Sequence, residues 1–233
     1  MYAVSDLYKT IIAQSEHWFE TKVNVNGVDY GEDILMSVRS SYRVFADEQP
    51  VVGGCLAAEL EVKMLTPSET IPRMAEVRPY VRVTDGTQTS EWIPQGVFYI
   101  DTRDTSNNDS DLSTIKLHCY DAMLRTEEDY PSTEHDWPMT DWDVVGEIAY
   151  AIGVTIDART SGLMTMQYPI GLPAGYSMRE VLGNIAAMYA GNWIMTFDGE
   201  LRLVTLTELP EETNYLVDSL YDAITFGGDR ILV

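Results

Sequence analysis

The sequence is poor in cysteine, in histidine and in basic residues. Its 233 residues include two cysteines, three histidines and 15 Lys+Arg against 37 Asp+Glu, which gives a formal net charge of −22. Neither Cys55 nor Cys119 belongs to a CxxC motif, so we predict two small apolar core residues in a reducing compartment. His17, His118 and His135 form no i,i+4 pair and no HExxH motif, which argues against a metal site.

Long hydrophobic runs are also missing. No stretch approaches the roughly 18 apolar residues that a membrane span needs, and the start, MYAVSDLYKTIIAQSEHW, has no basic segment followed by an apolar one. We therefore expect a soluble protein without a membrane span, made inside a cell. The acidic excess would repel phosphate backbones, so we expect no sequence-specific nucleic-acid binding. It fits a solvated surface, a basic partner, or the lining of a passage that must not hold a polyanion.

Motifs of catalysis and cofactor binding are absent as well. The sequence has no GxSxG elbow and no phosphate-binding loop, and we read Gly53-Gly54 as a bend or bulge before a strand. Residues 107–111, NNDSD, lack the order of a calcium loop and are interpreted as a polar turn. We predict no catalytic, cofactor-binding or metal-binding residues, no cofactor and no enzymatic activity.

The first half shows the alternation of β-strands. After a short helix over residues 5–14, Asn26-Gly27 and Asp85-Gly86 each separate two strand-like runs, as hairpin turns do. Residues 55–65, CLAAELEVKML, alternate apolar and polar side chains, which predicts one dry and one wet face.

The stretch EWIPQGVFYID, residues 91–101, predicts a chain break followed by a strand, with a polar loop over residues 102–113. In TIKLHCYD, which follows, Ile115, Leu117 and Cys119 share one face. Lys116, His118 and Tyr120 point the other way, toward solvent or a neighbouring subunit. His118 and Cys119 therefore cannot act as a catalytic dyad, and we interpret the stretch as scaffolding.

Helical spacing dominates after residue 125. An acidic connection over residues 125–138 leads to a helix capped near Thr140 and stopped by Gly153, then a strand over residues 154–157. A second helix begins at Ser177, where Glu180 completes a capping box, and stops at Gly191. Two strands joined by Asp198-Gly199 follow, and residues 224–233 predict one more strand pair that ends abruptly, so the natural polypeptide could be longer.

The two helices share V-x-G-x-I-A, at residues 144–149 and 181–186. Duplication of a helix-strand unit and similar core packing both explain this short match.

Three diffuse motifs carry a resemblance: W-I-P-x-G-x-F-Y-I-D, Y-D-A-M and R-E-V-L-x-x-I-A, within residues 33–204. With this order of elements, the chain resembles the N-terminal hub region of phage and prophage tail-tip proteins, the baseplate hub or tail-associated proteins. These are related to spike-base proteins of contractile injection systems and type VI secretion.

The resemblance implies a mainly β fold with an α+β second half. It implies two tube-like β-barrel domains, residues 1–125 and 126–206, the second with two short helices. In this family a returning segment, here residues 207–233, can complete the first barrel. It further implies a structural virion protein at the tail tip, assembled in the bacterial host cytoplasm. Three copies would form a homotrimeric ring that joins the tail tube to the tip, contacts the distal tail and tape-measure proteins, and lines the DNA passage.

Two other functions stay open at this point. One is a cell-wall hydrolase, supported only by the acidic residues and by the lysins fused to some members of the family. The other is a carbohydrate-binding module in which exposed Trp92, Trp137 and Trp142 act as sugar platforms, although Trp142 lies in the first turn of a helix and could pack there.

Overall fold

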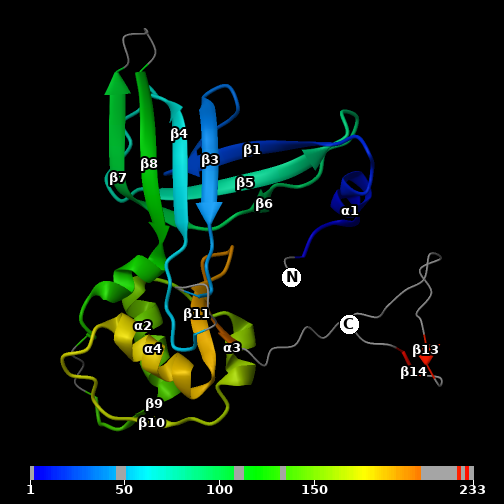
Figure 1. Cartoon of the computed structure of the whole chain (residues 1–233). Helices are drawn as coiled ribbons and strands as arrows, with labels where there is room; N and C mark the ends of the chain where they lie inside the picture. The colour runs from blue at the N-terminus through cyan, green and yellow to red at the C-terminus, as the bar shows by residue number, and fades with distance from the viewer. Residues whose placement is uncertain are drawn as a thin grey trace.

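One open antiparallel sheet makes up most of the N-terminal half of the computed structural model (Figure 1). The structure describes residues 3–45, 51–107, 113–131 and 135–205, and the backbone of 225–226 and 229–230. The strand order is β2-β1-β5-β7-β8-β4-β3, and β6 also pairs with β5. The strands are β1 Trp18–Val25, β2 Val28–Tyr30, β3 Leu35–Ser41, β4 Glu59–Leu65, β5 Glu76–Thr84, β6 Ile93–Pro94, β7 Phe98–Asn107 and β8 Ser113–Asp121.

Turn chemistry sets the register of this sheet. Asn26 and Gly27 have φ of 52° and 89° and close the β1–β2 hairpin, as predicted. Asp85 accepts hydrogen bonds from the backbone N–H groups of Thr87 and Gln88, which lower the pKa of its carboxyl to about 2. The Asp85-Gly86 turn is therefore also confirmed, with β6 returning along β5.

The sheet is sharply bent between β5 and β7. These strands share only the pairs Glu76↔Tyr99 and Val77↔Phe98, and β1 and β5 run across the direction of β3, β4, β7 and β8 (Figure 1). The bend brings the apolar faces of the two parts together, so residues of β1 and β5 share one core with residues of β4 and β8. As predicted, Leu60, Val62 and Met64 are buried there.

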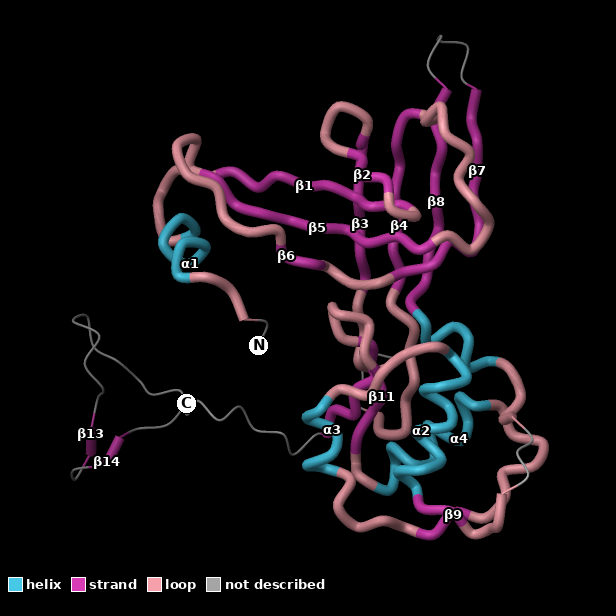
Figure 2. The backbone as a smooth tube through the Cα atoms, turned by 180° about the vertical axis from the view of Figure 1, so that it is seen from behind, coloured by secondary structure: helices cyan, strands magenta, loops and turns pink. Residues whose placement is uncertain are grey.

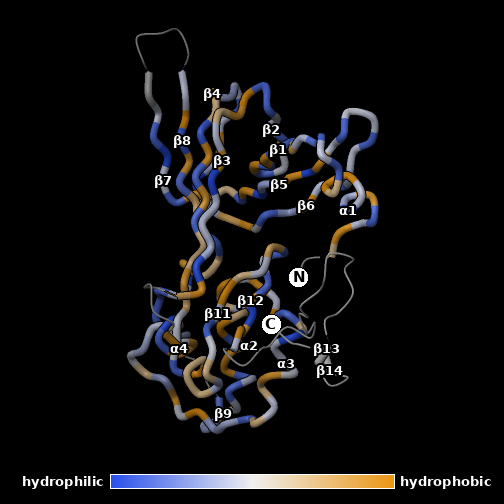
Figure 3. The backbone as a smooth tube through the Cα atoms, turned by 45° about the vertical axis from the view of Figure 1, so that its right-hand side comes forward, coloured by the Kyte–Doolittle hydropathy of each residue, from blue (hydrophilic) through white to orange (hydrophobic). Residues whose placement is uncertain are grey.

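Strand β7 is longer than we predicted. Residues 102–107, expected in a loop, continue the strand and pair with β8 as far as Asn107↔Ser113. Their side chains are polar, as the colouring of Figure 3 shows along β7. Thr102, Arg103, Asp104 and Thr105 are all exposed, so no apolar face marks this strand in the sequence.

The sheet is not closed in this chain. Strands β2 and β3 stand at the two ends of the strand path and are not paired with each other. The mainly β character and the helices of the second half are confirmed, whereas the described residues form no closed barrel.

The second half packs three α-helices and a short hairpin around a separate core. The capping and spacing signals predict two of these helices, and the third, α3, was not predicted. The elements are η1 Ala122–Glu127, β9 Met139–Thr140, α2 Asp141–Ile152, α3 Ala158–Leu163, β10 Pro169–Ile170, α4 Met178–Met188, β11 Gly191–Met195 and β12 Leu201–Thr205.

Helix capping follows the sequence signals at most ends. Thr140 caps α2, Gly153 ends it with φ of 76°, and Ser177 forms the full capping box with Glu180 at the start of α4. Residues 154–157 are not a strand but make an isolated bridge from Ile156 to β12. Asp157 then caps α3 by accepting the N–H of Arg159. Because residues 154–157 were expected to form a strand, Asp157 was not recognised as the N-cap of a helix.

The segment before β4 reaches into the second core. This segment comes down beside β11 (Figure 2). Gly53 N–H donates to Gly191 O at 2.8 Å, the N–H of Trp193 donates to Gly54 O at 2.8 Å, and Cys55 is buried in the second core. Gly53, with φ of 86°, makes the predicted bend. Residues 53–55 thus pack with the second core, although the expected boundary assigns them to the first domain.

Two short parts complete the described chain. Helix α1, Asp6–Ile12, is capped by Ser5, and Ser5 also donates through N–H and Oγ to the Glu91 carboxylate at 2.7 and 2.6 Å. Strands β13, Thr225–Phe226, and β14, Asp229–Arg230, form the predicted final pair. The rest of residues 207–233, expected to complete the first barrel, lies outside the described residues. In the part of the chain described here, no helix is long and apolar enough to cross a membrane.

Candidate assembly surfaces

The three histidines lie on separate parts of the fold. His17 Nδ1 is 2.9 Å from the backbone carbonyl three residues earlier. His118 Nε2 lies 3.7 Å from an Asp104 oxygen, and His135 Nε2 lies 2.6 Å from Glu147 Oε1. Across the described ranges, no three His, Cys, Asp or Glu side chains gather as a metal site would require. Residue 107 of the NNDSD segment ends β7, and residues 108–111 lie outside the description.

Both cysteines are free and buried, as predicted. Cys55 lies in the second core and Cys119 in the first. Burial raises the pKa of each thiol to about 12. A buried thiol that stays protonated is a poor nucleophile, so these residues contribute packing rather than chemistry.

The tryptophans proposed as sugar platforms are only half-exposed. Arg82 Cζ and Lys22 Nζ lie 4.3 and 5.0 Å from the Trp92 ring centroid. Trp137 and Trp142 pack against the second core. The expectation of three exposed rings is therefore wrong, because cations or core side chains already occupy their surfaces.

The outer face of β3, β4 and β8 is polar and largely charge-balanced. Lys116 Nζ lies 2.7 Å from Glu61 Oε2, and this hydrogen bond is the main cause that lowers the pKa of the Glu61 carboxyl. Lys116, His118 and Tyr120 are half-exposed on this face, opposite the buried residues of β8, as predicted. Such cross-strand pairs stabilise a sheet and leave a flat polar surface.

An aromatic cluster fills the junction between the sheet and the helical part. The Tyr42 ring meets Phe98 and Phe197 edge-on, at centroid distances of 6.1 and 5.2 Å, and its hydroxyl donates to the carbonyl of residue 95. Gly96, with φ of 122°, leaves room for this contact, since a Cβ there would lie 2.5 Å from the Phe98 ring. Gly96 belongs to one of the three sequence motifs, but the cluster itself could not be predicted, because its members are far apart in sequence.

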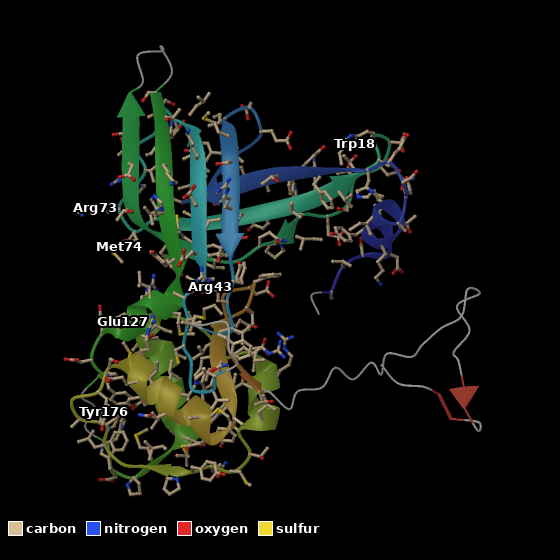
Figure 4. All side chains as sticks on the ribbon, viewed as in Figure 1. Trp18, Arg43, Arg73, Met74, Glu127 and Tyr176 are labelled. Carbon is tan, nitrogen blue, oxygen red and sulfur yellow. The ribbon has the colours of Figure 1, made fainter. Side chains whose placement is uncertain are left out.

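Large apolar side chains are exposed on the arm formed by α1 and the adjoining ends of β1 and β5. Trp18 is 57% exposed and Phe19 is 51% exposed, and Leu7 and Ile12 of α1 are exposed nearby in the chain. Figure 4 shows Trp18 at the far end of this arm. Within α1, Ile11 is the buried residue. Exposed aromatic residues of this size are typical of protein contact surfaces.

Comparisons with known proteins identify the fold. No protein-family model matches the chain, and no curated protein matches it. Among solved structures it is similar to the 43 kDa tail protein of prophage MuSo2 from Shewanella oneidensis, with 13% identity and a TM-score of 0.52 over 79% of this chain and 54% of that one. It is also similar to the tail protein from Neisseria meningitidis MC58, with 13% identity and a TM-score of 0.53 over 79% of this chain and 51% of that one.

A weaker likeness is to the half-lidded Francisella PdpA-VgrG complex, at 8% identity and a TM-score of 0.49 over 82% of this chain and 31% of that one. The chain spans about half the length of the two tail proteins. At these identities the likeness concerns the fold alone. The resemblance to phage tail proteins that the motifs suggested is thus confirmed: this chain has the fold of these two tail proteins.

Proposed function

We propose that the protein is a structural component of a phage or prophage tail, without enzymatic activity. The observation that carries this proposal is the fold shared with a prophage tail protein and a second tail protein, each over 79% of the chain. In finer detail, we propose a baseplate or tail-tip hub in which three copies form a ring. The ring joins the tail tube to the tip, contacts the distal tail and tape-measure proteins, and is assembled in the host cytoplasm.

The open sheet supports assembly into a ring. Strands β2 and β3 end the strand path, and an unpaired strand edge exposes N–H and C=O groups that another chain can satisfy. In a ring, neighbouring copies would cover these edges and complete the tube-like barrels that one chain leaves open. On this proposal residues 1–125 form the first unit, residues 126–206 the second, and residues 53–55 tie the two together.

The net charge of −22 supports a passage for DNA. A negatively charged bore would let a polyanion slide through without adhering. The surface potential of an assembled ring tests this part of the proposal, and a neutral or basic bore would reject it.

Light scattering on the purified protein tests the ring. We expect a concentration-dependent species near three times 26.2 kDa. Cryo-electron microscopy of intact tails should then place three copies at the tip. A protein that stays monomeric at all concentrations and is missing from tail particles would overturn the proposal. A zone of lysis in a cell-wall zymogram would contradict the absence of enzymatic activity.

A further inference from the structure

A notch of about 640 Å³ opens on one side of the junction between the sheet and the helical part. It lies among the loop before β5, the strands β7 and β8, and η1. Three arginines, Arg73, Arg103 and Arg125, line it together with Tyr99 and Tyr120. Figure 4 shows Arg73 and Met74 on the outer side of this junction, above Glu127. A volume of this size is typical of ligand-binding pockets and can hold several side chains of a bound peptide.

Among the described residues, these three arginines have no carboxylate partner, which is unexpected in a chain with 37 Asp+Glu and 15 Lys+Arg. Within the described ranges, no carboxylate oxygen lies within 4.0 Å of their guanidinium nitrogens. Four arginines elsewhere are ion-paired in the usual way: Arg78, Arg82, Arg159 and Arg179.

Two carboxyl groups, fewer than the three guanidinium groups, also line the notch, and among the described residues neither forms an ion pair with these arginines. The Asp121 carboxylate is buried and accepts hydrogen bonds from the backbone N–H groups of Ala58 and Met123, both at 2.9 Å. Asp101 is exposed on β7. The notch is therefore a site of net positive charge on a strongly acidic protein.

Backbone carbonyls hold two of the guanidinium groups in place. Arg103 Nη1 donates to Ile71 O at 2.5 Å, and Arg125 Nη1 donates to Ile152 O at 2.7 Å. Arg125 also stacks on Tyr99, with Cζ 3.9 Å from the ring centroid. A guanidinium has five N–H donors, so each group keeps donors for a further ligand, and a planar fork held in this way suits carboxylates.

Part of the rim of the notch is apolar. Met74 is 66% exposed and Leu124 is 37% exposed. Met74 also has φ of 55°, a conformation that costs free energy for a residue with a side chain and is concentrated at functional sites. The rim therefore offers anchoring points for apolar side chains next to the arginines.

We propose that this notch binds an acidic peptide segment of a partner protein, in which carboxylates alternate with apolar side chains. The carboxylates engage the arginines, and the apolar side chains cover Met74 and Leu124. A simple inorganic anion would leave the apolar rim unused. A nucleic acid would bring one negative charge per nucleotide along the whole acidic surface, whereas a short peptide brings only the few carboxylates that the three arginines can engage. This docking site goes beyond the proposed ring and does not depend on it.

Titration with a labelled hexapeptide tests the proposal. The probe is acetyl-(Glu-Leu)₃-amide, followed by fluorescence anisotropy against the purified full chain, with acetyl-(Gln-Leu)₃-amide and acetyl-(Glu-Ser)₃-amide as controls. We expect saturable binding of the first peptide that weakens as salt is added, and affinities lower by about tenfold for the Gln peptide and severalfold for the Ser peptide.

Variants locate the site. Arg73→Gln should weaken binding by about fivefold or more, because it removes one charge-assisted contact. The matched control Arg39→Gln removes the same charge from the outer face of β3 and should leave binding within about twofold. Met74→Gly keeps a residue suited to the positive φ, removes the apolar anchor, and should weaken binding by about threefold.

Several results would overturn the proposal. These are no saturable binding of the Glu-Leu peptide, equal binding of the Gln peptide, equal losses in Arg73→Gln and Arg39→Gln, or an unchanged affinity in Met74→Gly. Displacement of the peptide by a 12-nucleotide single strand of higher affinity would assign the notch to nucleic acid instead. A trimer that fails to bind the peptide would reject this inference and leave the proposed ring intact.

Discussion

Asp121 is a single residue that connects three segments at the junction of the molecule. It ends β8, caps η1 through the N–H of Met123, and accepts the N–H of Ala58 just before β4. Its side chain is buried, and burial raises the pKa of this carboxyl to about 6, while its two backbone hydrogen bonds and the nearby Arg179 lower it. A buried carboxyl with these partners makes the junction depend on pH.

The first prediction concerns the substitution Asp121→Asn. An amide can accept only one of the two N–H groups through its oxygen, so we expect a loss of about 1–3 kcal/mol in the free energy of unfolding near pH 4. The folded pKa of Asp121 lies above its ordinary value of 3.8. Its protonated form therefore stabilises the folded state fully below about pH 4, and this contribution is lost as the pH rises through about 6.

Because the variant lacks this titration, the difference from the unsubstituted protein should be largest near pH 4 and about 2 kcal/mol smaller at pH 7. Urea unfolding at several pH values measures this difference. Asp6→Asn is the control, since its side chain is 98% exposed. A penalty that is constant with pH, or that grows toward pH 7, would mean that Asp121 ionises in the ordinary range.

At the scale of elements, α2 and α4 carry the same motif, but its glycine has different neighbours in the two helices. The Val, Ile and Ala of V-x-G-x-I-A are buried in one shared core in both helices, which accounts for the match without duplication. The glycines differ. A Cβ on Gly146 would meet nothing within 4 Å, whereas a Cβ on Gly183 would lie 2.7 Å from Gly53 O. Gly183 thus allows the backbone at residues 53–54 to pack directly against α4.

The second prediction compares alanine at these two glycines. Gly146→Ala should raise the free energy of unfolding by about 0.5–1 kcal/mol, because alanine favours the helix and has space. Gly183→Ala should lower it by about 1–3 kcal/mol, because a backbone carbonyl must move. Thermal or urea unfolding checks both, each variant being the control of the other. If both substitutions changed the free energy of unfolding in the same direction, the close approach of Gly183 to Gly53 O would be refuted.

Local signals correctly predicted the turns and helix ends whose backbone conformation depends on one or a few nearby residues. Asn26-Gly27, Gly153 and the Ser177–Glu180 box are of this kind, since each satisfies a turn or helix end without help from distant residues. The continuation of β7 over residues 102–107 could not be predicted in this way. Its side chains have no apolar alternation, and only pairing with β8 makes the segment a strand.

At the scale of the whole molecule, the exposed arm is the surface that most needs an explanation. Trp18 and Phe19 are neighbours in the chain and both are more than half exposed. We therefore expect the arm to be covered in the proposed ring, where burial of two aromatic side chains favours association.

The third prediction is that Trp18→Ser combined with Phe19→Ser weakens the proposed trimer. We expect the association midpoint in light scattering to shift by at least about tenfold in concentration, because about 2 kcal/mol or more of apolar burial is lost. Tyr150→Ser is the matched control, since this tyrosine of α2 is 89% exposed but lies on the helical part. An equal shift in the control, or no shift in the double variant, would exclude the arm from the contact.

The sequence by itself determined the mainly β character, the hairpin turns, the capped helices and the burial of both cysteines. These features follow from backbone preferences and from alternation over a few residues, which act locally. The tertiary structure alone decided the bend between β5 and β7, the passage of residues 53–55 into the second core, and the gathering of Arg73, Arg103 and Arg125 at one notch. Each of these depends on which distant segments meet, and that choice is made by the packing of the whole chain rather than by any short stretch of it.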